Sequence, residues 1–200
     1  MNKQLILASK SPRRKQLLSQ LGFQFECLSA DIDESVLAGE SAEEYVKRVA
    51  IEKAQVVASK LEFSNSVVVL GSDTSVVIDG EILGKPSDKT DFIRMFTMLS
   101  GKRHQVITGI AIVQSNKVSA RIVTTDVYFK SLTEQEIENY WLSKEPVDKA
   151  GGYGIQGVGA QFVEKIDGCY FSVVGLPLFE TTQLLNEFGL FTPVQVASRN

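Results

Sequence analysis

Four basic side chains beside a predicted helix start are the first residues of this sequence that could do chemistry. They are Lys10, Arg13, Arg14 and Lys15. The apolar run 5–8 is typical of a buried strand, and Ser11 followed by Pro12 is a typical N-cap and first-turn pair, so we expect a helix to begin at Pro12. The start of a helix carries unpaired N–H groups and partial positive charge, which repel cations and attract anions. The cluster therefore suits a bound phosphate, although basic side chains that simply extend into solvent would also explain it.

Two carboxylates could act on such a phosphate or hold a metal ion. Asp73 follows the apolar run 67–70 in GSDT, so we expect it just past the carboxyl end of a buried strand, where open α/β sheets bind ligands. The alternative is an aspartate that only hydrogen-bonds within a turn. Glu34 lies in the acidic loop DIDESVLAGE and could supply a second hard oxygen ligand for magnesium or manganese, although such loops are often merely solvated.

Two lysines have different contexts. Lys85 lies between a glycine and a proline in GKP, after a predicted hairpin, so its backbone is constrained and its ammonium could contact a phosphate. Lys53 lies within a long predicted helix, where lysines usually face solvent, and its position alone gives it no role.

A glycine-rich segment, GGYGIQG at 151–157, contains a GxGxxG pattern from Gly152 to Gly157. Dinucleotide binding would require a strand before the pattern and a helix after it, whereas this segment follows a helix. The Walker pattern GxxxxGK[ST] does not occur in the sequence. We interpret the segment as a mobile loop whose small residues let a ligand approach, with the amide of Gln156 able to read the edge of a base.

The composition narrows the class of protein. The chain has 200 residues, 44% of them hydrophobic and 22% charged, which is typical of a soluble globular protein. Its net charge of -3 and its pI near 5.3 argue against a nucleic-acid partner. No signal peptide or membrane-spanning segment is predicted, so we expect a cytoplasmic protein with no membrane partner. We expect Cys27 and Cys169 to be small buried thiols, and His104, the single histidine, to be a half-exposed strand residue.

The elements that must position these residues alternate between strand and helix. For the first half we expect strand, helix and strand over 4–28, and then a helix from the capping box of Ser41 and Glu44 to about Lys60. An apolar strand that ends in a polar turn at GSDT should follow, and after it a hairpin with Asp79-Gly80 at its tip and a helix over 88–99. For the second half we expect strands over 104–114 and 117–129 joined at Ser115-Asn116, a helix from Thr133 and Glu136 to about Ser143, a hairpin turning at Asp167-Gly168, and a helix after Pro177. The class is mixed α/β, with a single domain over 1–190 and a C-terminal tail over 191–200.

Seven segments in order resemble the Maf family of nucleoside triphosphate pyrophosphatases. They are LASKSPRR, EKA, GSDT, GKP, TGI, DKAGGYGIQG and VGLPL, from Leu7 to about Phe188. The resemblance implies an elongated mixed sheet with flanking helices, two lobes around a central cleft, and kinship to inosine triphosphatase-like enzymes. It also implies that a divalent cation, Mg²⁺, Mn²⁺ or Co²⁺, assists cleavage between the α- and β-phosphates of a nucleotide, which gives the monophosphate and pyrophosphate.

Three positions distinguish branches of this family. Members that resemble dTTP and UTP pyrophosphatases have arginine after the proline of SPRR, threonine after the aspartate of GSDT, and glutamine in GYGIQG. Arg13, Thr74 and Gln156 match all three. The branch that prefers 7-methyl-GTP tends to show SPWR, GSDQ and a glutamate-containing loop. The resemblance therefore implies a pyrimidine nucleoside triphosphate as substrate, with CTP and modified pyrimidines left open.

The resemblance also implies roles for individual residues. Asp73 becomes the catalytic carboxylate, as general base or metal ligand, and Glu34 a second acidic ligand. The residues implied to bind phosphate are Ser9, Arg14, Lys53 and Lys85. Two other readings stay open, a non-catalytic role in arresting septum formation and an RNA-binding module that uses the basic helix end. Whether the chain forms a homodimer is also open.

Overall fold

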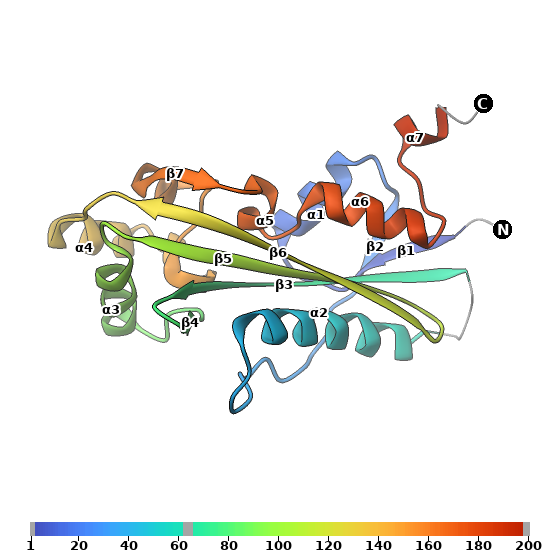
Figure 1. Ribbon diagram of the computed structural model, residues 1–200, viewed down its shortest axis with the longest axis horizontal. Coiled ribbons are helices and arrows are strands. Elements are labelled where there is room, and N and C mark those ends of the chain that lie inside the picture. Colours follow the sequence, from blue (N-terminus) through green and yellow to red (C-terminus); the bar gives the residue numbers. More distant parts are fainter. Residues whose placement is uncertain (1–2, 62–65, 198–200) are drawn as a thin grey trace. The chain divides into compact units, whose positions relative to one another are not determined.

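The computed structural model describes residues 3–61 and 66–197 (Figure 1). The chain forms two compact units, which are described separately. Unit 1 comprises Met1–Asp73, Thr108–Val123 and Gly175–Asn200, and unit 2 comprises Thr74–Ile107 and Thr124–Val174. Seven strands form a sheet in the order β2-β1-β3-β5-β6-β7, with β4 paired to β3. The long strands β3 (Val67–Ile78), β5 (Arg103–Gln114) and β6 (Lys117–Phe129) contribute residues to both units. Mixed α/β architecture is therefore confirmed.

Unit 1 is built on short parallel strands. The strand β1 (Gln4–Leu7) pairs in parallel with both β2 (Phe25–Cys27) and β3, with Leu7 opposite Leu70 of β3. In Figure 1, α2 (Ala42–Ser59) lies on one side of these strands, and α1 (Pro12–Gln20) and α6 (Leu178–Glu187) lie on the other. A short helix, α7 (Pro193–Ala197), ends the described part of the chain. Among the described residues, no helix combines the length and apolar character needed to cross a membrane.

Unit 2 packs its helices around an aromatic core. Its further elements are β4 (Glu81–Leu83), α3 (Lys89–Leu99), α4 (Glu134–Leu142), the 3-10 helices η1 (Glu145–Asp148), η2 (Ala150–Gly152) and η3 (Val158–Phe162), β7 (Val163–Asp167) and α5 (Tyr170–Val174). The rings of Phe92 and Phe96 on α3 are 4.3 Å apart, and Phe96 also meets Phe129 and Phe162 edge-on. Such ring pairs stabilise the core beyond the burial of their area.

Local signals in the sequence predicted the helix starts correctly. The side chain of Ser11 accepts a hydrogen bond from the backbone N–H of Arg14, and α1 begins at Pro12. Helix α2 begins with the capping box of Ser41 and Glu44. Helix α4 begins in the same way at Thr133 and Glu136. These predictions succeeded because a cap is a contact between residues three apart in the chain.

Two hairpin turns are also confirmed. Asp79 and Gly80 join β3 to β4 with φ angles of 50° and 82°, as a two-residue turn of type I′ requires. Ser115, with a φ angle of 51°, lies in the turn between β5 and β6.

Other sequence expectations were wrong. GSDT is not a turn, because β3 runs unbroken through it from Val67 to Ile78. Asp167-Gly168 is not a hairpin tip: β7 pairs with β6, and after Gly168 the chain enters α5. The glycine-rich segment 151–157 begins in η2 and continues as a turn that leads into η3.

Three side chains also differ in exposure or environment from what the sequence suggested. His104 is 2% exposed, and its Nε2 lies 2.8 Å from the hydroxyl of Tyr153. Burial lowers the pKa of His104 to about 4, against the opposing charge of Asp126, so its imidazole is neutral at pH 7. Cys27 is an exposed thiol and Cys169 is partly buried. Buried thiols were expected, but β2 is an edge strand of the sheet.

Close packing of α2 on the sheet of unit 1 depends on two glycines. A Cβ at Gly71 of β3 would overlap the carbonyl oxygen of Ala50 and lie 3.0 Å from the backbone nitrogen of Ala54. A Cβ at Gly109 of β5 would lie 2.7 Å from the carbonyl carbon of Val46. Because the obstructing atoms are helix backbone, they cannot turn aside as a side chain would. The glycines therefore set how closely α2 approaches the strands.

We expect Gly109→Ala to lower the free energy of unfolding by about 1–3 kcal/mol, because the new methyl group must displace α2. Urea unfolding followed by circular dichroism measures the change. Gly84→Ala is the matched control, since a Cβ there has no atom within 4 Å, and it should change stability by less than about 0.5 kcal/mol. Equal stability of the two variants would contradict this account of the packing.

Candidate active site

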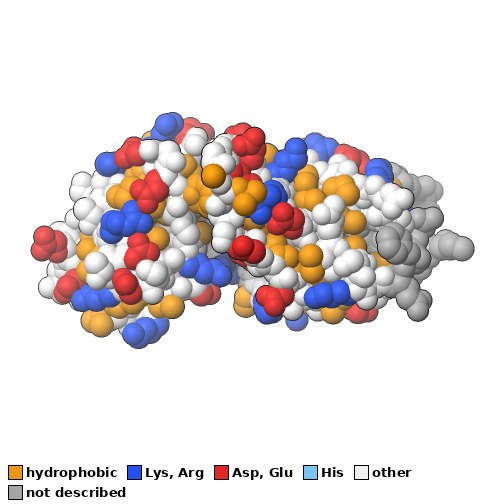
Figure 2. Space-filling model, turned by 90° about the horizontal axis from the view of Figure 1, so that it is seen from below, with side chains coloured by type: hydrophobic (Ala, Val, Ile, Leu, Met, Phe, Trp, Pro, Cys, Tyr) orange, Lys and Arg blue, Asp and Glu red, His pale blue; other side chains and the backbone are white. Residues whose placement is uncertain are grey.

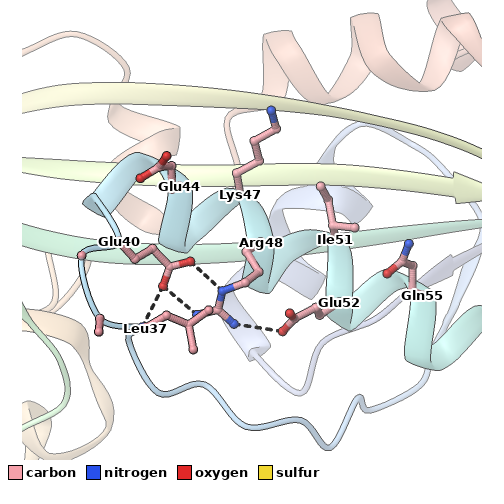
Figure 3. Close-up of a pocket in the computed structure, with 10 residues that line it drawn as sticks. Leu37, Glu40, Glu44, Lys47, Arg48, Ile51, Glu52 and Gln55 are labelled. Carbon is pink, nitrogen blue, oxygen red and sulfur yellow. Dashed lines mark hydrogen bonds and ion pairs between the residues drawn. The ribbon is translucent and has the colours of Figure 1, made fainter.

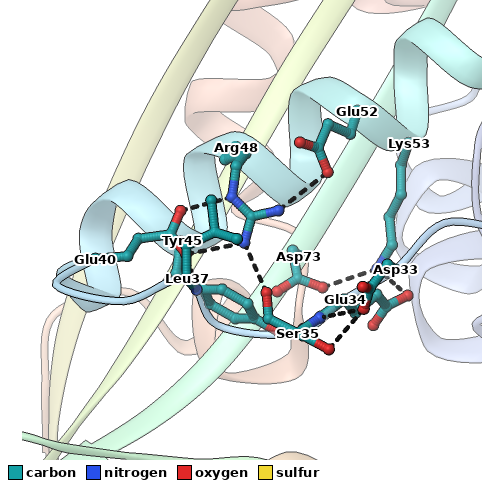
Figure 4. Close-up of polar contacts among 10 residues, drawn as sticks. All are labelled: Asp33, Glu34, Ser35, Leu37, Glu40, Tyr45, Arg48, Glu52, Lys53 and Asp73. Atoms are coloured by element: carbon teal, nitrogen blue, oxygen red, sulfur yellow. Dashed lines mark hydrogen bonds and ion pairs between the residues drawn. The ribbon is translucent and has the colours of Figure 1, made fainter.

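A lysine and two carboxylates meet in unit 1. The ammonium of Lys53 lies 2.8 Å from Oδ1 of Asp73 and 2.9 Å from Oε1 of Glu34. Asp73 and Lys53 are only 6% and 8% exposed, whereas the side chain of Glu34 is 46% exposed. The arrangement is thus a buried ion pair with a second carboxylate at its solvent side (Figure 4).

The position of Asp73 follows from the unequal lengths of neighbouring strands. The pairing of β1 with β3 ends at Leu7 and Leu70, and the N–H of Ala8 donates to the carbonyl of Leu70 at 2.8 Å. Asp73 lies three residues farther along β3, beyond the end of β1. We predicted an aspartate past the end of its own strand. It instead lies inside β3 and past the carboxyl end of the parallel strand beside it.

The alternation of side chains along β3 directs Asp73 towards α2. Residues two apart in a strand point to the same face. Gly71 faces the backbone of α2, so Asp73 faces the same helix, where it meets Lys53. Lys53 itself belongs to the buried stripe of α2, which consists of Val46, Val49, Ala50, Lys53, Ala54 and Val57. The expectation from helix statistics that this lysine faces solvent was wrong.

The second carboxylate oxygen of Asp73 differs from the first, which pairs with Lys53. Oδ2 is buried, and no hydrogen bond reaches it in the described part of the chain. A buried acceptor without a partner costs about 1–3 kcal/mol, and more when it is charged. This oxygen is therefore available to a cation or to the proton of a bound molecule.

The loop that carries Glu34 is held against α2 by Arg48. The guanidinium donates to both carboxylate oxygens of Glu40, at 2.6 and 2.8 Å, and to the backbone carbonyl of Ser35 at 2.9 Å. Its remaining nitrogen donates to Glu52 at 3.1 Å. Figure 4 shows Arg48 between the loop and its own helix. A bidentate arginine–carboxylate pair fixes orientation as well as distance.

Tyr45 fixes the same loop closer to the site. Its hydroxyl donates to the backbone carbonyl of Glu34 at 2.9 Å. Burial and the negative charges of Asp73 and Glu34 raise the pKa of Tyr45 to about 12, so the hydroxyl keeps its proton at pH 7. Neither Tyr45 nor Arg48 was predicted from the sequence to support the site. The i,i+4 spacing of Arg48 and Glu52 is visible in the sequence, but the return of the loop onto the helix is not.

The start of α1 supplies the basic side chains that were predicted. Ser9 accepts a hydrogen bond at its Oγ from the N–H of Ser11 at 3.1 Å. Nε of Arg14 donates to the carbonyl of Gly175 at 2.9 Å, and Ser72 donates to the same carbonyl at 3.0 Å. Burial lowers the pKa of Arg14, while the charge of Asp73 opposes that shift. Arginine titrates so far above neutrality that Arg14 still carries its charge at pH 7. Arg13 is partly buried in the same turn.

The other three predicted residues belong to unit 2. Thr74 directly follows Asp73 in β3 and is partly buried. Lys85 is exposed in the bend after β4, and Gln156 is exposed in the turn between η2 and η3. The structure thus brings Glu34, Lys53 and Asp73 into direct contact within unit 1, and it places these three residues on separate segments of unit 2.

An open pocket of about 620 Å³ lies on another side of α2 (Figure 3). It is lined by Leu37, Ala38, Gly39, Glu40, Glu44, Lys47, Arg48, Ile51, Glu52 and Gln55. None of the predicted site residues lines it. Figure 2 shows a face of the molecule on which basic and acidic side chains of the described residues are interspersed.

The donor set at Asp73 and Glu34 limits which metal site is conceivable. No group of three or more His, Cys, Asp or Glu side chains that could hold a metal is found among the described residues. Magnesium is commonly held by one or two carboxylates, with waters and substrate phosphates as its other ligands. Two carboxylates, one with a free buried oxygen, fit a cation of that kind and do not fit a closed structural metal site.

Comparisons with known proteins found a family and relatives that match nearly the whole chain. The family model described as Maf-like protein matches residues 4–188. A protein of Vibrio parahaemolyticus named dTTP/UTP pyrophosphatase is 55% identical over 184 residues, which cover 92% of this chain and 96% of that protein. A protein of Colwellia psychrerythraea with the same name is 54% identical over 190 residues, covering 94% and 90%. Among solved structures, the Staphylococcus aureus Ham1 protein is 16% identical, covers 80% of both chains and has a TM-score of 0.49.

The contacts of Arg48 generate a measurable prediction. Hydrogen bonds from Arg48 lower the pKa of Glu40 to about 2 from an ordinary value of 4.5. The stabilisation from this pair is therefore full above about pH 4.5 and is lost as the pH falls towards 2. We expect Arg48→Met to return the pKa of Glu40 to near 4.5 and to speed hydrogen exchange at Leu37, whose N–H donates to Glu40.

Carboxyl-carbon NMR titration and amide exchange measure these two effects. Arg94→Met is the matched control, because Arg94 pairs with Glu81 and Asp91 in unit 2 and should leave Glu40 unchanged. A pKa of Glu40 that stays near 2 without Arg48 would contradict the assigned contact.

Proposed function

This chain belongs to the Maf-like protein family, and from that premise we propose that it hydrolyses dTTP and UTP to the nucleoside monophosphate and pyrophosphate. The names of relatives that are more than half identical over nearly the whole chain support the activity and the substrate class. One structural observation carries the chemistry: a buried carboxylate, Asp73, is paired with Lys53 on one oxygen and receives no hydrogen bond from the described residues on the other. CTP and modified pyrimidine nucleotides are further candidate substrates.

The proposed reaction breaks the anhydride bond between the α- and β-phosphates. A water oxygen forms a bond to phosphorus, the bridging oxygen leaves with the pyrophosphate, and Asp73 accepts the proton of the water as general base. Lys53 and Arg14 stabilise negative charge that develops on the phosphate oxygens. Because the ammonium of Lys53 lies 2.8 Å from Oδ1 of Asp73, Lys53 both orients this general base and supplies positive charge beside it.

As the alternative to acting as general base, Asp73 would, together with Glu34, hold a divalent cation, Mg²⁺, Mn²⁺ or Co²⁺. The free Oδ2 of Asp73 and the half-exposed carboxylate of Glu34 suit an ion that shares its remaining positions with water and phosphate. Such a cation, when bound, neutralises phosphate charge and polarises the phosphoryl oxygen. Tyr45 and Arg48 support Glu34 in this role by holding its loop.

The remaining residues are proposed to bind the nucleotide. Ser9, Arg14, Lys53 and Lys85 contact phosphates, and Arg13, Thr74 and Gln156 select the pyrimidine. The exposed amide of Gln156 supports this role, because it can donate to a carbonyl of uracil or thymine and accept from the ring N–H. We further propose that the protein acts on free nucleotides in the cytoplasm, with neither nucleic acid nor membrane as a partner. A measurement of its mass in solution would decide whether it forms a homodimer.

The first functional prediction concerns metal and products. EDTA should abolish turnover of UTP and dTTP, and added Mg²⁺ or Mn²⁺ should restore it, because the phosphate charge otherwise lacks its main counter-charge. Ion-exchange chromatography of the products should show monophosphate and pyrophosphate. Diphosphate and orthophosphate as products would rule out cleavage between the α- and β-phosphates.

The second functional prediction concerns the buried carboxylate of Asp73. Asp73→Asn keeps the shape of the side chain and removes its charge, so kcat should fall by roughly two to four orders of magnitude while the fold is retained. Steady-state kinetics and circular dichroism measure both. Asp79→Asn is the matched control, since Asp79 lies in an exposed turn and should retain full activity. An Asp73→Asn variant with a tenth of the wild-type rate would leave Asp73 with only a structural role.

A further inference from the structure

The turn that carries Gln156 is attached at its far side to one carboxylate. Oε2 of Glu145 accepts the N–H of Val158 at 2.7 Å, and Oε1 accepts the N–H of Gly159 at 3.0 Å. The hydroxyl of Tyr140 donates to Oε1 at 2.7 Å. One glutamate from η1 thereby holds the first residues of η3, only two positions after Gln156.

The near side of the turn is attached through Tyr140. Its hydroxyl accepts the N–H of Gly154 at 3.2 Å while donating to Glu145. The turn itself is closed by a hydrogen bond from the N–H of Gly157 to the carbonyl of Gly154 at 3.2 Å. Both ends of the turn are therefore tied to the same pair of side chains, and the exposed Gln156 lies between the two attachments.

The glycines of this segment serve the attachment. A Cβ at Gly157 would overlap the carboxylate of Glu145, and one at Gly159 would lie 2.5 Å from the hydroxyl of Tyr140. A Cβ at Gly154 would lie 2.9 Å from Cε of Lys149 and 3.2 Å from Oε1 of Glu145. We expected small residues that let a ligand approach. At these three positions the approaching group belongs to the protein itself.

Glu145 is charged in this setting. Burial acts to raise the pKa of Glu145, but the N–H donors of Gly159 and Val158, the hydroxyl of Tyr140 and the charge of Lys149 outweigh it, and the pKa is lowered. Hydrogen bonds to an ionised acceptor are about twice as strong as those between neutral groups. Burial and the bond to Glu145 raise the pKa of Tyr140, so its hydroxyl remains a donor.

We propose that Glu145, with Tyr140, is a positioning residue for base selection: it holds the 154–159 turn in one conformation so that the amide of Gln156 meets the pyrimidine without first being ordered. This inference rests on the proposed function, in which Gln156 reads the base. A side chain that is ordered before binding loses less conformational entropy on contact, and its hydrogen bonds discriminate more sharply between bases. Glu145 acts through Gln156 and does not touch the nucleotide.

The test compares kcat/KM for UTP with kcat/KM for 7-methyl-GTP in four forms of the full chain. These are the wild type, Glu145→Gln, Gln156→Ala and the double variant. In Glu145→Gln an NH2 group replaces one of the two carboxylate oxygens, and it cannot accept the backbone N–H that faces it, so the turn should loosen. We expect the UTP preference to fall about tenfold in Glu145→Gln and by at least as much in Gln156→Ala. The double variant should show no further loss beyond Gln156→Ala, because Glu145 acts only through that residue.

Two further variants separate positioning from folding. Glu138→Gln is the matched control, since Glu138 is an exposed residue of α4 that pairs with Lys89, and its UTP preference should equal that of the wild type. If Glu145→Gln is unfolded by circular dichroism, Tyr140→Phe replaces it, because it removes both hydroxyl bonds and keeps the ring in the core. We expect Tyr140→Phe to lower the UTP preference in the same direction.

Three results would overturn the inference. One is an equal loss of kcat/KM for both nucleotides in Glu145→Gln, which a general structural role would produce. Another is a double variant that loses more preference than Gln156→Ala alone. The third is an unchanged preference in Gln156→Ala. The proposed hydrolysis survives all three, because it fails only if the wild type releases no pyrophosphate from UTP or dTTP.

Discussion

The buried pair of Asp73 and Lys53 is the constraint on which the rest of unit 1 depends. Removing a carboxylate and an ammonium from water costs several kcal/mol for each ion, and the loss is recovered only when the two are held at contact distance. The contact at 2.8 Å requires α2 to lie close against β3, and Gly71 permits that approach because it has no side chain. The close packing of α2 on β3 and the pairing of the two buried charges therefore depend on each other. What stays unbalanced is Oδ2 of Asp73, to which no described residue donates a hydrogen bond.

The acidic loop shows how an exposed group is given a fixed position. Glu34 is half-exposed, and an exposed ion pair alone seldom fixes a side chain. Here the backbone is held at Glu34 and at the residue after it, by Tyr45 at the carbonyl of Glu34 and by Arg48 at the carbonyl of Ser35. The neighbouring Glu40 attaches Arg48 at two points. Rigidity thus comes from the helix, and the loop supplies only the functional group.

The sequence predicted contacts that are local and missed those that are distant. Ser11, the two capping boxes and the Asp79-Gly80 turn were correct because each depends on residues two or three positions apart. The continuity of β3 through GSDT was missed because it is enforced by neighbouring strands and not by its own residues. Lys53 was misjudged on residue type alone, although it falls within the periodic stripe of buried residues on α2. The periodicity of α2 indicates a buried Lys53, whereas the general preference of lysine for solvent indicates an exposed one.

The glycine-rich segment shows why a pattern of small residues is ambiguous on its own. A glycine indicates that some group approaches the backbone closely, but it does not indicate whether that group belongs to a ligand or to another part of the chain. In GGYGIQG the group at Gly157 is the carboxylate of Glu145, twelve positions earlier in EPVD. An acid at that distance carries no periodic signal, and only folding through η1 and η2 brings it back. The segment is therefore better understood as an anchored turn than as an open loop, and the residue that the anchor leaves exposed is the amide of Gln156.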